Sequence, residues 1–207
     1  QVGTGIIDSM IAGSVDVGYI PSMGAAGVLA AAERGLIPGT LVPVAANSFT
    51  DRDHPSTGVL VASSINSWKD LEGRQIGSPL LKGISPAAMK VRLQQEGVRN
   101  YTFVEIPFAN LGLAVAGGNI AAAVMNEPFL TQSLLRGDGK LLGWVIGGPP
   151  FERMEFDLIV FRGDFYRNNS QAVKAFLRAH LQAVRWINEN PDGARSVLVK
   201  RLALTEE

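Results

Sequence analysis

The sequence predicts an α/β protein with largely parallel β-sheets, and two observations carry this prediction. Short apolar runs recur along the 207 residues, and most are separated by stretches whose apolar residues have helical spacing. Glycine and proline, at 23 and 11 residues, interrupt the pattern between these stretches. Strands that alternate with helices at short spacing need crossover connections, and such connections favour parallel strand neighbours.

The apolar runs predict strands, in chain order, at residues 16–20, 41–46, 58–62, 75–78, 102–106, 121–125, 141–146 and 156–161. A helix is predicted over residues 86–95, and Gly97 is suited to end it. The longest helix is expected to begin at Ser170 as its N-cap and to end before Pro191. One face of this helix forms an apolar packing stripe of Val173, Phe176, Leu177, Leu181, Val184 and Ile187.

Composition and charge exclude several classes of function. The chain has 19 basic and 19 acidic side chains without a block of like charge, which argues against nucleic acid or an anionic membrane as partner. It has no cysteine and only two histidines, His54 and His180, so we expect no metal centre, disulfide or thiol nucleophile. No G-x-S-x-G sequence is present. We therefore expect no catalytic residue and no cofactor.

Candidate ligand contacts lie where predicted strands end and helices begin. In an open parallel sheet, ligands bind beyond the carboxyl ends of the strands, where helix amides are unpaired. The first such loop holds Ser22, Met23 and Gly24, whose small or flexible side chains let a ligand approach the backbone. For Ser22, capping of the following helix is the alternative to ligand contact.

A second loop follows the strand at residues 75–78 and contains Lys82, Gly83 and Ser85. Ser85 is suited to be an N-cap with Pro86 in the first helical position, so the free amides beside the Lys82 ammonium could hold an oxyanion. A solvated loop cation and a purely local cap are the alternatives.

The third loop is Asn126-Glu127-Pro128, in which Pro128 is expected to start a helix. The side chains of Asn126 and Glu127 can point into a cleft at this position. Glu127 is open to two interpretations: it receives an ammonium or hydroxyl group of the ligand, or it forms a structural salt bridge.

Two motifs resemble one family of binding proteins. Residues 67–78, SWKDLEGRQIGS, are similar to a "DLKGKKVAVP" run, and residues 125–129, MNEPF, are similar to a "W(D/E)P(F/Y)" run that lines a ligand cavity. These runs are typical of the NMT1/THI5-like solute-binding proteins of ABC importers, which take up sulfonates, taurine, nitrate and thiamine precursors. Met125 and Asn126 stand where many of these proteins have aromatic residues, and both are candidate cavity residues.

The resemblance implies a type II periplasmic binding protein fold, with two lobes of mostly parallel sheet and a cleft between them. It assigns residues 1–72 and 153–207 to lobe one and residues 73–152 to lobe two. Strands 57–62 and 155–161 are then expected to lie side by side between the lobes, with hinges near residues 63–69 and 151–155. The pattern over residues 6–18 usually comes later in the family, so we expect the first part of lobe one to be missing.

The implied function is capture of a small acidic or zwitterionic solute, such as a sulfonate, by hinge closure. The expected partners are the permease and ATPase of an ABC importer, and the expected state is a monomer. The expected location is the periplasm, or the cell exterior with a lipid anchor. Two alternatives stay open: a sensor or effector domain of a regulator, and an enzyme of thiamine or menaquinone-precursor synthesis on the same fold.

Overall fold

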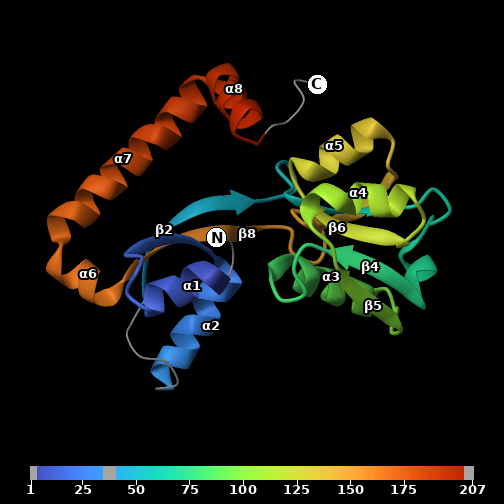
Figure 1. Ribbon diagram of the computed structural model, residues 1–207, viewed down its shortest axis with the longest axis horizontal. Helices are drawn as coiled ribbons and strands as arrows, with labels where there is room; N and C mark the ends of the chain where they lie inside the picture. Colours follow the sequence, from blue (N-terminus) through green and yellow to red (C-terminus); the bar gives the residue numbers. More distant parts are fainter. Residues whose placement is uncertain (1–3, 35–40, 203–207) are drawn as a thin grey trace. The chain divides into compact units, whose positions relative to one another are not determined.

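The computed structural model describes residues 4–34 and 41–202, and these residues divide into two compact units between Arg162 and Gly163 (Figure 1). The strands, all in the first unit, are β1 (Val17–Pro21), β2 (Leu41–Thr50), β3 (Thr57–Val61), β4 (Arg74–Ser78), β5 (Tyr101–Glu105), β6 (Ala122–Asn126), β7 (Lys140–Ile146) and β8 (Met154–Arg162). Each predicted strand is confirmed, with ends that shift by a few residues. The helices of this unit are α1 (Thr4–Ile11), α2 (Ser22–Glu33), α3 (Ile84–Gln95), α4 (Phe108–Ala116) and α5 (Phe129–Arg136), with a short 3₁₀ helix at Trp68–Leu71.

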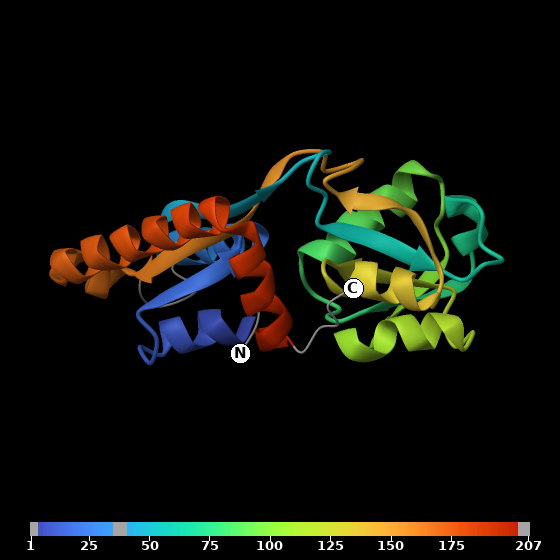
Figure 2. The same cartoon turned by 90° about the horizontal axis from the view of Figure 1, so that it is seen from above.

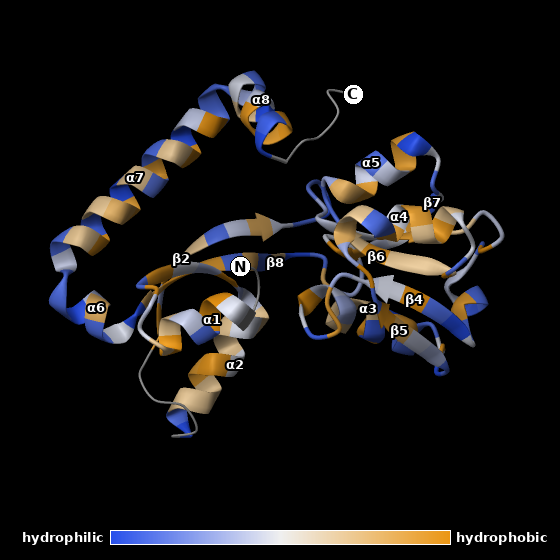
Figure 3. Cartoon of the chain, viewed as in Figure 1, coloured by the Kyte–Doolittle hydropathy of each residue, from blue (hydrophilic) through white to orange (hydrophobic). Residues whose placement is uncertain are grey.

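A five-stranded sheet has the order β5-β4-β6-β3-β7. Strand β3 is buried along its whole length because β6 and β7 pair with it on either side. Figures 1 and 2 show α3 on one face of the sheet and α4 and α5 on the other. The core on the α3 face includes Ile76, Met89 and Leu93, and the core on the opposite face includes Leu111 and Leu130. Burial on both faces explains the apolar character of β6 in Figure 3.

The three-stranded sheet has the order β1-β8-β2 and pairs strands from both ends of the first unit. Ile7 and Met10 of α1 and Ala25 of α2 pack with Ile20 and Val160 on one face of this sheet. The register places Gly18 opposite Val160. A Cβ atom on Gly18 would lie 2.6 Å from Ile6 Cγ2, so the absence of a side chain lets α1 approach the sheet closely.

The α/β class is confirmed, but parallel pairing covers less of the sheets than expected. Strand β4 is parallel to β5 and β6, because α3 and α4 provide crossover connections between these strands. The remaining pairs, β1–β8, β2–β8, β3–β6 and β3–β7, are antiparallel.

The expected pairing of residues 57–62 with 155–161 is wrong. Strand β3 pairs with β6 and β7, whereas β8 pairs with β1 and β2. The chain therefore passes between the sheets at residues 51–56 and returns at residues 147–153, so residues 63–69 are not one of the crossings. The expectation came from the lobe division that the resemblance implies, and the residues themselves do not specify which strands pair. The assignment of residues 1–72 and 153–207 to one lobe and of residues 73–152 to the other stays a prediction.

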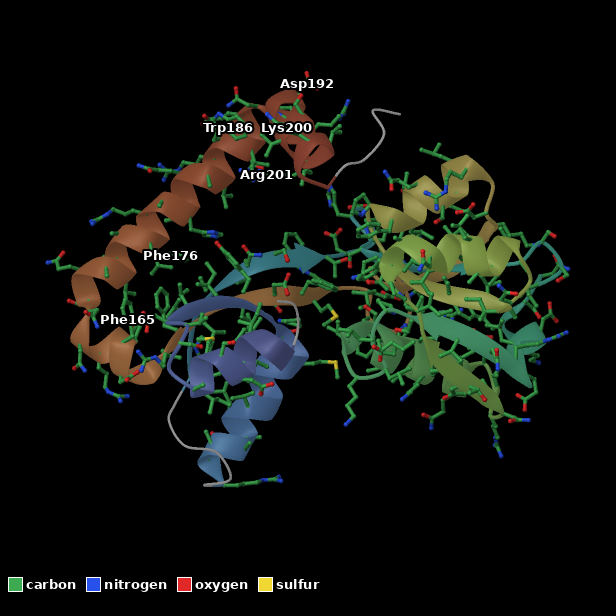
Figure 4. The ribbon with its side chains drawn as sticks, in the orientation of Figure 1. Phe165, Phe176, Trp186, Asp192, Lys200 and Arg201 are labelled. Atoms are coloured by element: carbon green, nitrogen blue, oxygen red, sulfur yellow. The ribbon has the colours of Figure 1, made fainter. Side chains whose placement is uncertain are left out.

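The second unit contains α6 (Gly163–Asn168), α7 (Ser170–Glu189) and α8 (Pro191–Leu202). Asn169, not Ser170, is the N-cap residue of α7. The neighbours of α7 within this unit are α6 and α8, so its predicted apolar stripe is only partly buried. Val173 is 5% exposed, whereas Leu181 is 54% exposed. Figure 4 shows Trp186 near the turn into α8, where a Cβ atom on Gly193 would lie 3.3 Å from the indole ring.

None of the described helices is long and apolar enough to cross a membrane.

Candidate functional site

A pocket of about 670 Å³ lies within the first unit, a volume typical of small-molecule sites. The ends of four strands surround it, three of them together with the helix start that follows: β1 with α2, β4 with α3, β5 with α4, and β6. Most of the lining is apolar. The polar side chains in it are Lys82, Ser85 and Asn126.

The structure brings together six of the nine residues predicted for the site: Met23, Gly24, Lys82, Gly83, Ser85 and Asn126. They come from all three of the predicted strand-end loops. Met23 is 48% exposed, and Lys82 is also exposed, so both are accessible from the pocket. Ser22, Met125 and Glu127 do not line this pocket.

Ser85 is buried and has a different role from the expected N-cap. Gly83 is the N-cap residue of α3, which places Ser85 and Pro86 inside the first helical turn. The Ser85 hydroxyl donates a hydrogen bond of 3.1 Å to Asn126 Oδ1 on β6. The Ile84 and Ser85 amides in the first turn of α3 have no acceptor within the helix and lie at the positive end of its dipole, whereas Pro86 has no N–H to donate. Two of the predicted loops are therefore joined by a direct hydrogen bond.

Ser22 is the first residue of α2 and does not cap that helix; Pro21 is its N-cap residue. The Ser22 hydroxyl donates a hydrogen bond of 2.8 Å to the Glu155 carbonyl on β8. This bond fixes the start of α2 against the three-stranded sheet, beside the lining residues Met23 and Gly24.

Met125 is 1% exposed and belongs to the core on the α4 and α5 face of the five-stranded sheet. Adjacent residues of a strand point to opposite faces of the sheet. Because the Asn126 side chain faces the pocket, the Met125 side chain points away from it. The sequence motif alone did not separate the two, because it runs across the end of the strand.

Glu127 binds the start of α5. Its carboxylate accepts hydrogen bonds from the Thr131 backbone amide at 3.1 Å and from the Thr131 hydroxyl at 2.9 Å. Thr131 is in the first turn of α5, and Pro128 is the N-cap residue, so α5 begins at Phe129. A carboxylate at a helix N-terminus is stabilised by the unpaired amides and the helix dipole. Each oxygen of the Glu127 carboxylate therefore accepts one hydrogen bond from the start of α5.

Sequence reasoning missed most of the apolar lining. Pro107 and Phe108 line the pocket at the junction of β5 and α4, a strand end of the same kind as the three predicted loops. The same periodicity argument could have identified this loop. Ile7 and Phe156 come from α1 and β8, and no local signal in the sequence marks them. The other missed residues lie in or beside two of the predicted loops: Pro21, Pro79, Leu80, Ile84 and Pro86.

The charge around the pocket favours an anion. Lys82 is the charged residue of the lining, and the lining contains no carboxylate. Asp157 follows the lining residue Phe156 on β8, and burial raises the pKa of its carboxyl above the ordinary value, against the lowering effect of a Ser48 hydrogen bond. Among residues 4–34 and 41–202, no group of three or more acidic or histidine side chains could hold a metal ion.

A family model described as NMT1/THI5-like matches residues 48–194. The alkanesulfonate-binding protein SsuA from Xanthomonas axonopodis pv. citri, solved with MOPS, is similar over 97% of this chain and 66% of its own, with 18% identity and a TM-score of 0.76. The periplasmic aliphatic sulphonate binding protein SsuA from Escherichia coli has the same coverage and identity and a TM-score of 0.73.

The periplasmic nitrate-binding protein NrtA from Synechocystis PCC 6803 is similar over 97% of this chain and 56% of its own, with 16% identity and a TM-score of 0.75. This chain therefore spans between 56% and 66% of the length of these three solved proteins. The TM-scores show a shared fold, that of the type II periplasmic binding proteins. No curated protein matches the sequence.

Proposed function

The chain belongs to the NMT1/THI5-like family, and from this premise we propose that it is part of the solute-binding component of an ABC importer. It captures a small organic anion and performs no reaction. Its location is the periplasm or the cell exterior, and it delivers its solute to a membrane permease driven by an ATPase. The similarity in fold to sulfonate- and nitrate-binding proteins supports this proposal.

The composition of the pocket is the observation that carries the proposal. Apolar side chains such as Phe108 and Phe156 supply most of the surface, while Lys82, Ser85 and Asn126 gather at the start of α3. An apolar body with one acidic head group fits this arrangement, because the helix start and the ammonium attract negative charge. A sulfonate with a short alkyl chain has this chemistry.

Hinge closure is the proposed mechanism, and its hinges are residues 51–56 and 147–153. Each segment connects the two sheets of the first unit. Arg52 donates to Glu152 across the two segments at 2.5 Å. Asp51 accepts hydrogen bonds from the His54 and Asp53 amides, and the His54 amide is the largest cause that holds the pKa of Asp51 below its ordinary value. The turn that contains Asp51 and His54 is therefore held by local hydrogen bonds. A bound solute that contacts residues beside both sheets raises the population of the closed state.

Native mass spectrometry of the purified protein tests the proposed function. We expect an additional mass that corresponds to a small organic acid and that disappears after the protein is unfolded and refolded in ligand-free buffer. A bound nucleotide or a covalently altered molecule would instead support a regulator or an enzyme and would contradict the proposal.

A further inference from the structure

We infer that the Asn126 side-chain amide, oriented by Ser85, makes the pocket select an oxyanion and reject a ligand that carries an ammonium group. This inference rests on the proposed function and specifies the ligand class of the same site. It departs from one of the two sequence-based interpretations of Glu127, in which this residue provides a partner for an amine.

The orientation of the amide follows from one hydrogen bond. The Ser85 hydroxyl donates to Asn126 Oδ1 at 3.1 Å, so the oxygen of the amide faces Ser85. Within residues 4–34 and 41–202, no group accepts a hydrogen bond from Asn126 Nδ2. An amide nitrogen donates two hydrogen bonds and accepts none. Asn126 therefore offers two donors to the pocket that it lines, while its oxygen already accepts one hydrogen bond from Ser85.

Ser85 is suited to hold this orientation because it is 7% exposed and fixed in the first turn of α3. Thr57 lies directly opposite Asn126 in the β3–β6 ladder, so the two side chains are on the same face of the sheet. The Thr57 hydroxyl is completely buried and has no hydrogen-bond partner among the described residues, so it does not occupy the amide donors. The two Asn126 amide donors therefore have no partner among the described residues and stay available to a ligand in the pocket.

The charged group that faces the pocket is a cation, and donors lie beside it. The Asn126 amide, the first-turn amides of α3 and the Lys82 ammonium all favour an anionic oxygen. An ammonium group needs an acceptor, and the nearest carboxylate in the sequence, Glu127, accepts two hydrogen bonds from Thr131 instead. A zwitterion would bring its positive charge into a pocket lined by Lys82 and by no acid, where the charge cannot be compensated.

Calorimetric titration with two matched ligands tests this inference. The probes are propane-1-sulfonate and 3-aminopropane-1-sulfonate, which differ in one ammonium group. We expect the protein to bind propane-1-sulfonate at least about tenfold more tightly than 3-aminopropane-1-sulfonate. A tenfold ratio of affinities corresponds to about 1.4 kcal/mol, and burial of an uncompensated charge costs more than this. Asn126→Asp replaces the donors by a carboxylate of the same shape. This variant should bind propane-1-sulfonate about tenfold or more weakly than the unmodified protein. It should also narrow or reverse the preference for propane-1-sulfonate over 3-aminopropane-1-sulfonate, because the new carboxylate can pair with the ammonium.

Two further variants separate orientation from stability. Ser85→Ala removes the hydrogen bond that orients the Asn126 amide. We expect this variant to bind propane-1-sulfonate about threefold more weakly, a loss near the value of one neutral hydrogen bond. Its preference between the two probes should also be smaller. Glu127→Gln is the control and should leave the preference unchanged. If Asn126→Asp fails to fold, Asn126→Ser removes the amide donors without adding charge and should narrow the preference between the probes.

The outcomes distinguish this inference from the proposed function. Binding of both probes with equal affinity, or an unchanged preference in Asn126→Asp, would overturn the role of the amide and leave the proposed function intact. A loss of preference in Glu127→Gln would show that Glu127 is the discriminating group. Absence of binding by both probes to the unmodified protein would contradict the proposed function itself.

Discussion

At the scale of single residues, Glu127 shows how a side chain that looks like a ligand contact can serve the fold instead. Its carboxylate binds the first turn of α5 through Thr131. Glu127→Ala should lower the free energy of unfolding by about 1 kcal/mol, because the loss of a helix cap typically costs about 0.5–2 kcal/mol. Urea denaturation measures this change. Glu105→Ala, at an exposed acid of β5, is the control and should have little effect.

Asp157 gives a pH-dependent prediction at the same scale. Burial is the largest influence on its carboxyl and raises the pKa above 3.8 in the folded protein. The folded state therefore binds the proton more strongly than the unfolded state, and this carboxylate destabilises the fold at a pH above its raised pKa. Asp157→Asn should raise the melting temperature at pH 7, and the gain should disappear as the pH falls below the ordinary value. An equal gain at pH 3 would contradict the burial of this charge, and Asp53→Asn, at an exposed loop residue, is the control.

At the scale of elements, the contact between α4 and the end of α5 depends on Gly112. A Cβ atom there would lie 2.3 Å from both Asp138 Oδ2 and Ser133 Oγ, and both of these residues are buried. Gly112→Ala should therefore destabilise the protein by about 1–3 kcal/mol, as overpacking of a core does. Gly27→Ala is the matched control in α2, where a Cβ atom meets nothing within 4 Å. It should stabilise the protein by about 0.5–1 kcal/mol in the same denaturation experiment, since alanine favours helices.

The sequence predicted the elements well and their partners poorly. Each strand was found because its apolar run and its Gly or Pro boundary are local features. The neighbour of β3 was predicted incorrectly, because the pairing of β3 with β6 and β7 depends on residues that are distant in the sequence. The residues of the candidate site divide in the same way into local features that were predicted and distant ones that were missed. Lys82, Ser85 and Asn126 follow strand ends and were found, whereas Ile7 and Phe156 reach the pocket through tertiary packing alone.

At the scale of the whole molecule, the central claim is that the pocket binds a small organic anion. Six residues from three separate loops of the sequence meet in one apolar pocket with a single lysine and no acid. This arrangement requires both sheets of the first unit, because Met23 and Gly24 adjoin the three-stranded sheet and Ser85 and Asn126 adjoin the five-stranded one. Binding is therefore a property of the assembled unit rather than of one loop.

The adjacent residues Leu80 and Leu81 provide the most direct test of this claim. Leu80 lines the pocket and Leu81 does not, yet their exposed fractions are 40% and 43%, so a charge at either position is compatible with folding. Calorimetric titration with propane-1-sulfonate should show that Leu80→Glu weakens binding by about tenfold or more, because a like charge is placed beside the anion. Leu81→Glu should bind within about threefold of the unmodified protein, since its charge is separated from the pocket and screened by solvent. Equal affinities of the two variants would contradict the assignment of this pocket as the anion site.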